Sequence, residues 1–225
     1  MNTAPLLNKN CSTEFNRDTA YWNEYYKKNT PESMPESNFA SFVKKYLKSG
    51  KTLVDLGCGN GRDSLYFSKL GVNVIGIDAS DTSIAKLNSL KIKNASFICG
   101  NFISCPLIYA KKVEYFYSRF SIHAIDEKGE DEILANIFNA LIPEGKLFVE
   151  VRGIHDPKFG QGENIGPNSY ILDGHYRRFI VMEEFLSKLI KNGFHIKYAE
   201  EEKNFAPYND ENPQIIRIVA EKEHP

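Results

Sequence analysis

The sequence predicts an α/β fold, a doubly wound, seven-stranded, mostly parallel sheet with helices on both faces and an antiparallel edge strand. Three observations predict it. Short β-branched runs alternate with amphipathic stretches from about residue 51 onward, a glycine-rich turn follows the first run, and prolines separate the last two runs. The 225 residues suffice for one core, so we expect one domain with additions at its ends.

Seven segments carry the strand pattern of β-branched and aromatic residues. Pro207 and Pro213 lie between the last two, which favours an antiparallel pair at one edge. The predicted strands are 52–56, 72–77, 95–99, 113–118, 146–151, 195–200 and 214–220.

Amphipathic helices are expected between the strands, over 62–70, 82–91, 131–141 and 182–192. Residues 1–50 are expected to form an N-terminal helical arm or lid, with helices over 18–28 and 37–48 and a proline-containing loop over 29–36. The first of these helices is aromatic on one side, through Tyr21, Trp22, Tyr25 and Tyr26. Residues 51–225 would form the main domain, with a substrate-covering or merely mobile loop near 153–178.

Bulk composition argues against several kinds of partner. With 28 basic and 29 acidic residues the net charge is −1, so we expect no nucleic acid partner. The four cysteines show no metal-binding or disulfide spacing, and the first ten residues look like a frayed tail and not a leader. No apolar run is long enough for a membrane span. We therefore expect a cytoplasmic monomer or homodimer without a metal site.

The most informative stretch is 54–63, VDLGCGNGRD, which leaves a strand and enters a helix. Glycines at alternate positions permit a sharp turn and let the backbone approach a ligand. Asp78 follows the next strand, where a carboxylate would accept hydrogen bonds from ribose hydroxyls. Asn101 and Phe102 follow the third strand, a suitable place for an adenine.

A dinucleotide site is the competing interpretation, because residues 59–64 approximate GxGxxG. Asp55 and Asp63 argue against it, since both carboxylates would repel a pyrophosphate at that helix N-terminus, whereas Asp55 can receive a cationic amino group. The glycines could also be turn residues alone, with Asp63 a helix-capping charge. The occurrence of polar groups at three successive strand ends favours a ligand.

These motifs resemble the class I methyltransferases over about residues 50–151. The resemblance implies S-adenosyl-L-methionine as the cofactor and S-adenosyl-L-homocysteine as its product. It implies that the glycine loop holds the methionine part. The aromatic arm either closes over the cofactor and excludes water or simply packs against the sheet. The implied cofactor-binding residues are Asp55, Gly57, Cys58, Gly59, Asn60, Gly61, Asp63, Asp78, Ala79, Gly100, Asn101, Phe102, Ser118 and Trp22.

The acceptor side begins after the fourth strand, at Arg119 and His123. The (N/D)PP(Y/F) motif of DNA amino-methyltransferases is absent here, so a small acceptor is favoured. His123 could act as a general base beside Arg119, or each could merely cap a helix or pair with a carboxylate. Arginines suit carboxylate or phosphate groups, which predicts an anionic acceptor, although Arg177 or Arg178 could instead anchor a loop. The predicted substrate-binding residues are Arg119, Arg152, His175, Arg177 and Arg178.

Short patterns, YSRFSIHAI, FVEVRG and HYRRF, resemble bacterial small-molecule methyltransferases of capsule and lipopolysaccharide modification. This resemblance implies a role in surface-polysaccharide modification. Two other functions stay open at this point. One is a cofactor-binding regulatory protein without catalysis, and the other is an NAD-dependent oxidoreductase.

Overall fold

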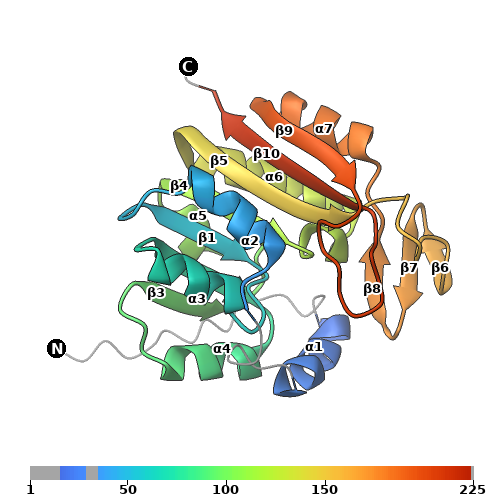
Figure 1. The fold of residues 1–225 in the computed structure, drawn as a ribbon, viewed down its shortest axis with the longest axis horizontal. Coiled ribbons are helices and arrows are strands. Elements are labelled where there is room, and N and C mark those ends of the chain that lie inside the picture. The colour runs from blue at the N-terminus through green and yellow to red at the C-terminus, as the bar shows by residue number, and fades with distance from the viewer. Residues whose placement is uncertain (1–15, 29–34, 224–225) are drawn as a thin grey trace.

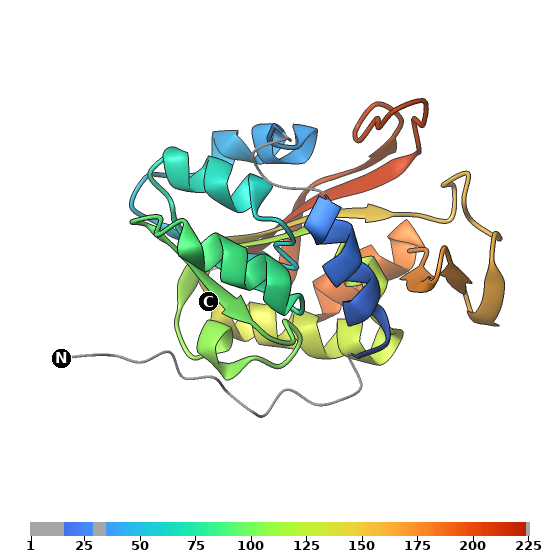
Figure 2. The same cartoon turned by 90° about the horizontal axis from the view of Figure 1, so that it is seen from below.

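The computed structural model describes residues 16–28 and 35–223 (Figure 1). The predicted N-terminal tail, Cys11 and most of the 29–36 loop lie outside the described residues. Within the described part, a seven-stranded sheet forms the centre, with helices on both of its faces (Figures 1 and 2). This confirms the predicted doubly wound α/β fold.

The sheet has the strand order β3-β2-β1-β4-β5-β10-β9. The first five strands are parallel, and β10 is antiparallel to both of its neighbours. The antiparallel pair expected at one edge is therefore β9 with β10. All seven predicted strands are present, as β1 (Thr52–Leu56), β2 (Asn73–Asp78), β3 (Ala95–Cys99), β4 (Val113–Arg119), β5 (Leu141–Arg152), β9 (Phe194–Glu202) and β10 (Ile215–Lys222).

The strand β5 begins earlier than predicted, because the chain runs directly from a helix into the strand at Leu141. Its register against β4 shifts after this first pair, and Glu144 there adopts a positive φ of 62°. The sequence does not indicate this start, because it is followed by Pro143, Glu144 and Gly145, none of which is typical of a strand.

The expected helices are all present within the described residues, with one arm helix divided into α2 and η3. Two short helices, α5 (Pro106–Tyr109) and η4 (Ile122–Ala124), were not predicted, because they are below the length at which a periodic pattern can be read. No described helix is long and apolar enough to cross a membrane. The helices are α1 (Asn16–Lys28), α2 (Asn38–Val43), η3 (Lys44–Tyr46), α3 (Arg62–Lys69), α4 (Asp81–Ser89), α6 (Glu127–Ala140) and α7 (Met182–Lys191).

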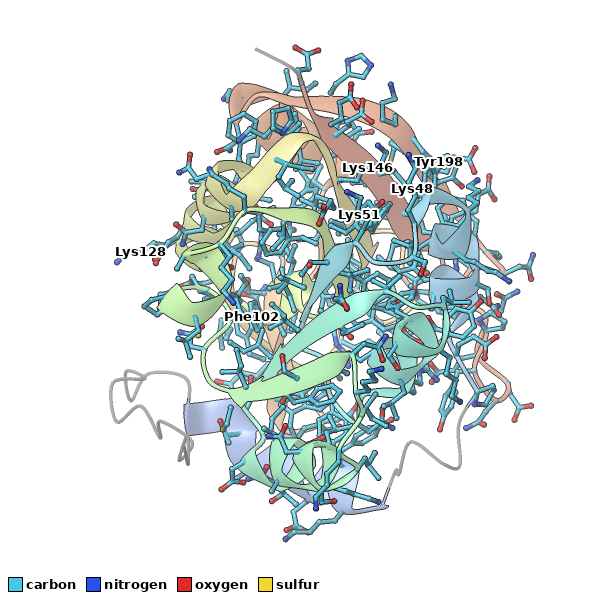
Figure 3. All side chains as sticks on the ribbon, turned by 90° about the vertical axis from the view of Figure 1, so that its left-hand side faces the viewer. Lys48, Lys51, Phe102, Lys128, Lys146 and Tyr198 are labelled. Atoms are coloured by element: carbon cyan, nitrogen blue, oxygen red, sulfur yellow. The ribbon has the colours of Figure 1, made fainter. Side chains whose placement is uncertain are left out.

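Two apolar layers hold the helices against the sheet. On one face, α2 and α3 pack on the inner strands through Phe39 and Phe67, and α4 extends this layer at the β3 edge through Leu87. On the other face, α5, α6 and α7 pack through residues such as Ile133 and Phe185. Side chains fill both layers, and Lys128 extends outward from the molecule (Figure 3). The layers fix the strand ends on which the site is built.

The segment near 153–178, expected to be a loop, contains a separate three-stranded antiparallel sheet. Its strands are β6 (Glu163–Gly166), β7 (Ser169–Leu172) and β8 (His175–Arg178), in that order. A cluster of Phe159, Tyr170 and Phe179, with ring centroids 5.5–5.9 Å apart, supports it. The strands escaped prediction because each has four residues and glycines and prolines lie among them.

The arm helix α1 lies beside the carboxyl ends of the parallel strands, in contact with both α4 and β8 (Figures 1 and 2). It therefore joins the two halves of the molecule at the edge where ligands bind in such sheets.

Candidate active site

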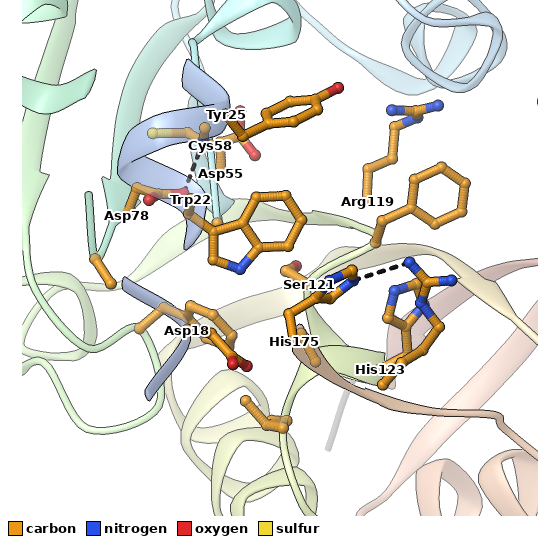
Figure 4. Close-up of a pocket in the computed structure, with 18 of the residues that line it drawn as sticks. Asp18, Trp22, Tyr25, Asp55, Cys58, Asp78, Arg119, Ser121, His123 and His175 are labelled. Atoms are coloured by element: carbon orange, nitrogen blue, oxygen red, sulfur yellow. Dashed lines mark hydrogen bonds between the residues drawn. The ribbon is translucent and has the colours of Figure 1, made fainter. Parts of the chain in front are cut away.

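A cavity of about 1060 Å³ lies at the carboxyl ends of the parallel strands, beneath α1. Cavities that hold one ligand typically measure ~300–1,000 Å³, so this one has room for a cofactor and an acceptor together. Its walls come from the glycine loop, α1, the segment after β4, the small sheet and the chain before β10. Figure 4 shows carboxylates on one side of the cavity, and Arg119, His123 and His175 on the other.

The glycine loop needs glycine at each of its three positions. Gly57, Gly59 and Gly61 have φ values of 73°, 54° and 80°, in the left-handed region that other residues avoid. A β-carbon on Gly61 would collide with Leu87 of α4, so the third glycine serves helix packing and does not line the cavity. A β-carbon on Gly57 would lie 2.6 Å from that of Ser121.

Asp78 is buried at the end of β2, as predicted, and both of its oxygens are occupied by the backbone. Oδ2 accepts the Gly59 N–H at 2.9 Å, and Oδ1 accepts the Ser80 N–H at 2.9 Å. Burial raises the pKa of Asp78, and these backbone donors partly offset that rise. Each carboxylate oxygen has a second lone pair, so Asp78 can close the loop and still accept a ribose hydroxyl.

Asp55 is buried below the loop, 3% exposed, and accepts a hydrogen bond from Ser64 Oγ at 2.6 Å. Burial raises its pKa to about 8, the Ser64 hydroxyl opposes this rise, and the charges of Asp63 and Asp78 add to it. Without a ligand Asp55 therefore holds a proton at neutral pH. A cationic amino group nearby would favour the carboxylate form.

Asp63 lines the same cavity, but other side chains already occupy its carboxylate. Its oxygens accept the backbone N–H and the hydroxyl of Ser37, at 2.8 and 2.7 Å, and the Tyr117 hydroxyl at 2.7 Å. The bonds tie the N-cap of α2 to α3 and β4. We therefore assign Asp63 first to holding the cavity wall, with its negative charge facing the glycine loop.

Eleven of the fourteen predicted cofactor residues line the cavity. Gly61, Gly100 and Ser118 do not. The Gly100 N–H donates to the Asp78 carbonyl at 2.9 Å, and the Ser118 hydroxyl pairs with that of Ser121 at 2.7 Å. The lining set is Asp55, Gly57, Cys58, Gly59, Asn60, Asp63, Asp78, Ala79, Asn101, Phe102 and Trp22.

These residues fit S-adenosylmethionine. Three acidic side chains, Asp55, Asp63 and Asp78, suit its cationic methionine end and its ribose hydroxyls, and the buried Phe102 offers an apolar surface to an adenine. Within the described ranges, no cluster of His, Cys, Asp or Glu could hold a metal ion.

The aromatic side chains of α1 form the roof of the cavity. Trp22 lies in a cluster with Tyr21, Tyr25 and Tyr26, at centroid distances of 5.1–5.8 Å. A β-carbon on Gly59 would clash with the Tyr26 hydroxyl. At the other end of α1, Tyr21 stacks on His175 at 4.4 Å.

Asp18, on the same helix, lines the cavity and was not predicted. Its Oδ2 accepts the Tyr176 N–H at 3.2 Å, and its Oδ1 is buried without a hydrogen-bond partner among the described residues. The sequence around Asp18 does not indicate this position, because Tyr176, which lies against it, is 158 residues away.

On the acceptor side, Arg119 pairs with the buried Glu150 at 2.8 Å, and Glu150 also pairs with Arg217 at 2.6 Å. The Arg119 guanidinium lies 4.4 Å from the centre of the Phe120 ring, and that of Arg152 lies 5.6 Å from it. Phe120 adopts a φ of 56°, a conformation that is strained for a bulky residue and clusters at functional sites. Phe120 therefore holds two arginine side chains together in the wall of the cavity.

The neighbouring arginines of β8 point to different surroundings. Arg178 pairs with the buried Glu130 and donates to the Ile125 carbonyl at 3.2 Å, and it does not line the cavity. Arg177 lines the cavity, and its Nη2 contacts His175 Nε2 at 2.9 Å. The placement of Arg178 thus matches the loop-anchor alternative and not substrate binding. Arg152 lines the cavity and pairs with Asp156 at 2.5 Å.

His123 is buried in the cavity wall and its Nδ1 accepts the Arg152 N–H at 3.1 Å. Burial lowers its pKa well below the usual value, and the charges of Arg177 and Arg152 lower it further. The neutral ring therefore carries its proton on Nε2. In that state Nε2 donates a hydrogen bond and neither nitrogen is free to take a proton, so the expected general-base role does not fit this geometry.

Comparison with known proteins identifies the type of domain. A family model described as a methyltransferase domain matches residues 53–145, less than half of the chain. Phosphoethanolamine N-methyltransferase 1 of Triticum aestivum is 27% identical over 150 residues, which are 60% of this chain and 30% of that protein. A probable S-adenosyl-L-methionine-dependent methyltransferase, TehB, of Haemophilus influenzae is 54% identical over 41 residues, 18% of this chain and 14% of that protein. The chain thus spans less than a third of the length of each of these relatives.

Solved structures share the fold at low identity. A TehB-like methyltransferase from Corynebacterium glutamicum has a TM-score of 0.64 at 19% identity, covering 91% of this chain and 98% of its own. The 1,6-didemethyltoxoflavin-N1-methyltransferase of Burkholderia thailandensis, solved with S-adenosylhomocysteine, has a TM-score of 0.71 at 16% identity, covering 99% of this chain and 93% of its own. The dehydrogenase interpretation finds no support among these matches.

Proposed function

Because this chain belongs to the class I S-adenosylmethionine-dependent methyltransferases, we propose that it transfers a methyl group to an oxygen or nitrogen of a small anionic molecule. S-adenosylmethionine is the cofactor, and S-adenosylhomocysteine is its product. When bound, the cofactor supplies an activated methyl group, so the protein is left to bind, align and exclude water.

One observation supports the proposal that the acceptor is an anion. Arg177 lines the cavity, and its Nε and Nη1 are buried with no hydrogen-bond partner among the described residues. A buried charged group without a partner is costly, and it calls for a ligand or water that satisfies it. The pKa of Arg177 is lowered by this burial and by the charge of Arg152, so the site gains from a bound anion.

The surrounding ion pairs leave an excess of positive charge. Glu150 is shared by Arg119 and Arg217, and Asp156 neutralises Arg152. No carboxylate within residues 16–28 and 35–223 forms an ion pair with Arg177. Guanidinium groups bind carboxylates and phosphates through two parallel hydrogen bonds, so a small acid would complete this set.

The roles of the residues follow from their places. Asp78 and the glycine loop would hold the ribose and methionine ends of the cofactor, and Trp22 would cover the site from α1. Arg177 and Arg152 would bind the acceptor's negative group, with His123 donating a hydrogen bond through Nε2. In-line alignment of this kind can contribute ~7–11 kcal/mol to lowering the barrier.

The named relatives are consistent with a small acceptor. The protein from Triticum aestivum is named for phosphoethanolamine, a small molecule with a phosphate group, and the one from Burkholderia thailandensis for a toxoflavin precursor. The resemblance to capsule and lipopolysaccharide methyltransferases makes sugar acids and sugar phosphates the first acceptors to screen. A cytoplasmic location and a monomeric or homodimeric state complete the proposal.

The test replaces the proposed anion-binding arginines one at a time. Arg177→Gln and Arg152→Gln should each raise the KM of an acidic acceptor about 10- to 100-fold, the loss of a charged hydrogen bond. The dissociation constant of S-adenosylhomocysteine, measured by calorimetry, should change by less than about threefold. This corresponds to ~0.6 kcal/mol of binding free energy, which is less than the loss of a direct hydrogen bond to the cofactor would cause. Equal losses in both quantities would contradict the assignment.

A further inference from the structure

We infer that Asp18 is a specificity-determining residue of the acceptor site, and that the methyl acceptor carries a hydroxyl or amino group in addition to its anionic group. This inference rests on the proposed function and narrows it. It follows from two side chains of opposite charge, Asp18 and Arg177, which line the same cavity and each have buried polar atoms without a partner among the described residues.

The carboxylate of Asp18 is satisfied by the protein at one oxygen only. Its Oδ2 accepts the Tyr176 N–H at 3.2 Å, whereas its Oδ1 is buried without a hydrogen-bond partner within residues 16–28 and 35–223. Removing a polar oxygen from water without supplying a donor is costly. A ligand that brings an N–H or O–H to Oδ1 would remove this cost.

Arg177 has the opposite requirement. Its Nη2 contacts His175 Nε2 at 2.9 Å, and its Nε and Nη1 are buried without partners in the part of the chain that the structure describes. A guanidinium donates hydrogen bonds and an ionised carboxylate accepts them, so an anionic group that satisfies Arg177 leaves Asp18 without a donor. A molecule that has an anionic oxygen and a separate N–H or O–H would satisfy both residues.

Both side chains belong to the junction between α1 and β8. The ring of His175 stacks on Tyr21 of α1 at a centroid distance of 4.4 Å, and the next residue, Tyr176, donates its N–H to Asp18. Arg177 follows on the same face of the strand as His175, because side chains alternate along a strand. A methyl acceptor bound at this junction therefore meets a carboxylate from the helix and a guanidinium from the strand.

The chemistry of Asp18 ranks the groups that it would bind. A hydrogen bond between a carboxylate and an ammonium group is stronger than one between a carboxylate and a hydroxyl, because both partners are charged. An alkyl group offers no donor and would leave Oδ1 unsatisfied. Among acids with one carbon skeleton, the affinity should therefore rise from the plain acid to the hydroxy acid and to the amino acid.

The alternative role for Asp18 is to receive the amino group of the cofactor. Its hydrogen bond to Tyr176, the residue before Arg177, favours the acceptor side of the cavity. The affinity of an Asp18 variant for S-adenosylhomocysteine distinguishes the two roles, because an acceptor-binding residue leaves it unchanged.

The test measures dissociation constants by ligand-observed NMR, with protein that is saturated with S-adenosylhomocysteine. The probes are straight-chain carboxylic acids and alkyl phosphates of increasing chain length, each in a plain, an ω-hydroxy and an ω-amino form, together with the uncharged alcohols of the same lengths. The proteins are the parent, Asp18→Asn and the control Glu24→Gln. Glu24 lies on the same helix with its side chain 65% exposed, so this variant makes the same chemical change away from the cavity.

We expect the parent to bind the ω-amino or ω-hydroxy form of at least one acid about tenfold more tightly than the plain form, or better, as one added hydrogen bond to a charged group would give. Asp18→Asn should lose most of this preference, because an amide N–H₂ replaces one of the two accepting oxygens. Its affinities for the plain acids and for S-adenosylhomocysteine should change by less than about threefold. Glu24→Gln should match the parent in every measurement.

Two results would overturn this inference and leave the proposed function intact, provided that Arg177→Gln still weakens the binding of every acid. One is a parent that binds the three forms equally, and the other is an Asp18→Asn variant that keeps the preference. Equal weakening of plain and substituted acids by Asp18→Asn would show that Asp18 only holds α1 against β8, and a loss of S-adenosylhomocysteine affinity would assign it to the cofactor. Either result would also overturn the inference. A parent that binds none of the acids, or binds the uncharged alcohols as well as the acids, would overturn the proposed function itself.

Discussion

The carboxylate of Asp78 accepts the backbone N–H of Gly59 at 2.9 Å, across the turn that joins β1 to α3. The residue that we propose for the ribose thus also fixes the shape of the glycine loop. If Asp78 binds the ribose as proposed, ribose binding and the shape of the glycine loop are coupled through this one buried side chain.

Asp78→Asn should weaken S-adenosylhomocysteine binding about 10- to 100-fold, because one of the two backbone donors would face an amide N–H₂ in place of an oxygen. Calorimetric titration measures the affinity. Asp81→Asn, an exposed change in the same turn, is the matched control and should bind normally. Normal binding by Asp78→Asn would contradict the coupled role.

The raised pKa of Asp55, about 8 when no ligand is bound, predicts a pH-dependent stability. Between pH 4 and pH 8 the unfolded chain loses this proton while the folded state keeps it. The free energy of unfolding should then fall as pH rises, by up to about 1.4 kcal/mol per pH unit from this group. Chemical denaturation between pH 5 and pH 8 without cofactor measures the slope.

Asp55→Asn is the control for this slope, since it keeps the volume and can still accept the Ser64 hydroxyl. The variant should lose the Asp55 share of the pH dependence and be more stable than the parent at pH 8. Identical slopes for parent and variant would show that Asp55 is already ionised in the folded state.

Gly59→Ala should displace α1, because the new β-carbon would meet the Tyr26 hydroxyl and the φ of 54° would be strained. Trp22 is the single tryptophan of the chain, so its fluorescence reports on α1 directly. We expect a shifted emission and at least about tenfold weaker cofactor binding, corresponding to ~1.4 kcal/mol.

Gly50→Ala is the matched control for Gly59→Ala. Its φ is 80°, and nothing lies within 4 Å of an added β-carbon. Its free energy of unfolding should fall by roughly 1–2 kcal/mol, the cost of placing a side chain at a positive φ, and its Trp22 emission should be unchanged. If both variants changed the emission equally, the contact with Tyr26 would not explain the effect.

Arg178→Gln should lower stability and leave the acceptor KM unchanged, the opposite of Arg177→Gln. Arg178 neutralises Glu130, which is 1% exposed. In the variant, Lys188 at 2.9 Å would be the remaining ion-pair partner of Glu130 within the part of the chain that the structure describes. We expect a loss of roughly 1–3 kcal/mol, measured by thermal unfolding. Arg177→Gln should cost little stability, since its Nε and Nη1 lack partners among the described residues. Equal stability losses in the two variants would contradict this division.

Much of the fold and of the cofactor side could be predicted because the signals are local. Strands β1 and β3 end where the β-branched runs end, and the spacing of Gly57, Gly59 and Asp78 lies within one βαβ unit. Such patterns need no knowledge of the partner segments.

The acceptor side was less predictable because its chemistry depends on long-range pairs. Arg177 and Arg178 are adjacent in the sequence, and only their place in a strand, where side chains alternate between faces, separates their roles. The bond from the Arg152 N–H to His123 joins two segments 29 residues apart, and it decides which ring nitrogen carries the proton. The sequence around His123 does not contain that information.

The most direct test compares methyl transfer to a small acid and to its neutral amide, by the parent protein and by Arg177→Gln. The account predicts that the parent prefers the acid by about 10²-fold or more in kcat/KM, a difference of ~3 kcal/mol, and that Arg177→Gln loses most of this preference. A parent protein that methylates the amide as well as the acid would contradict the account.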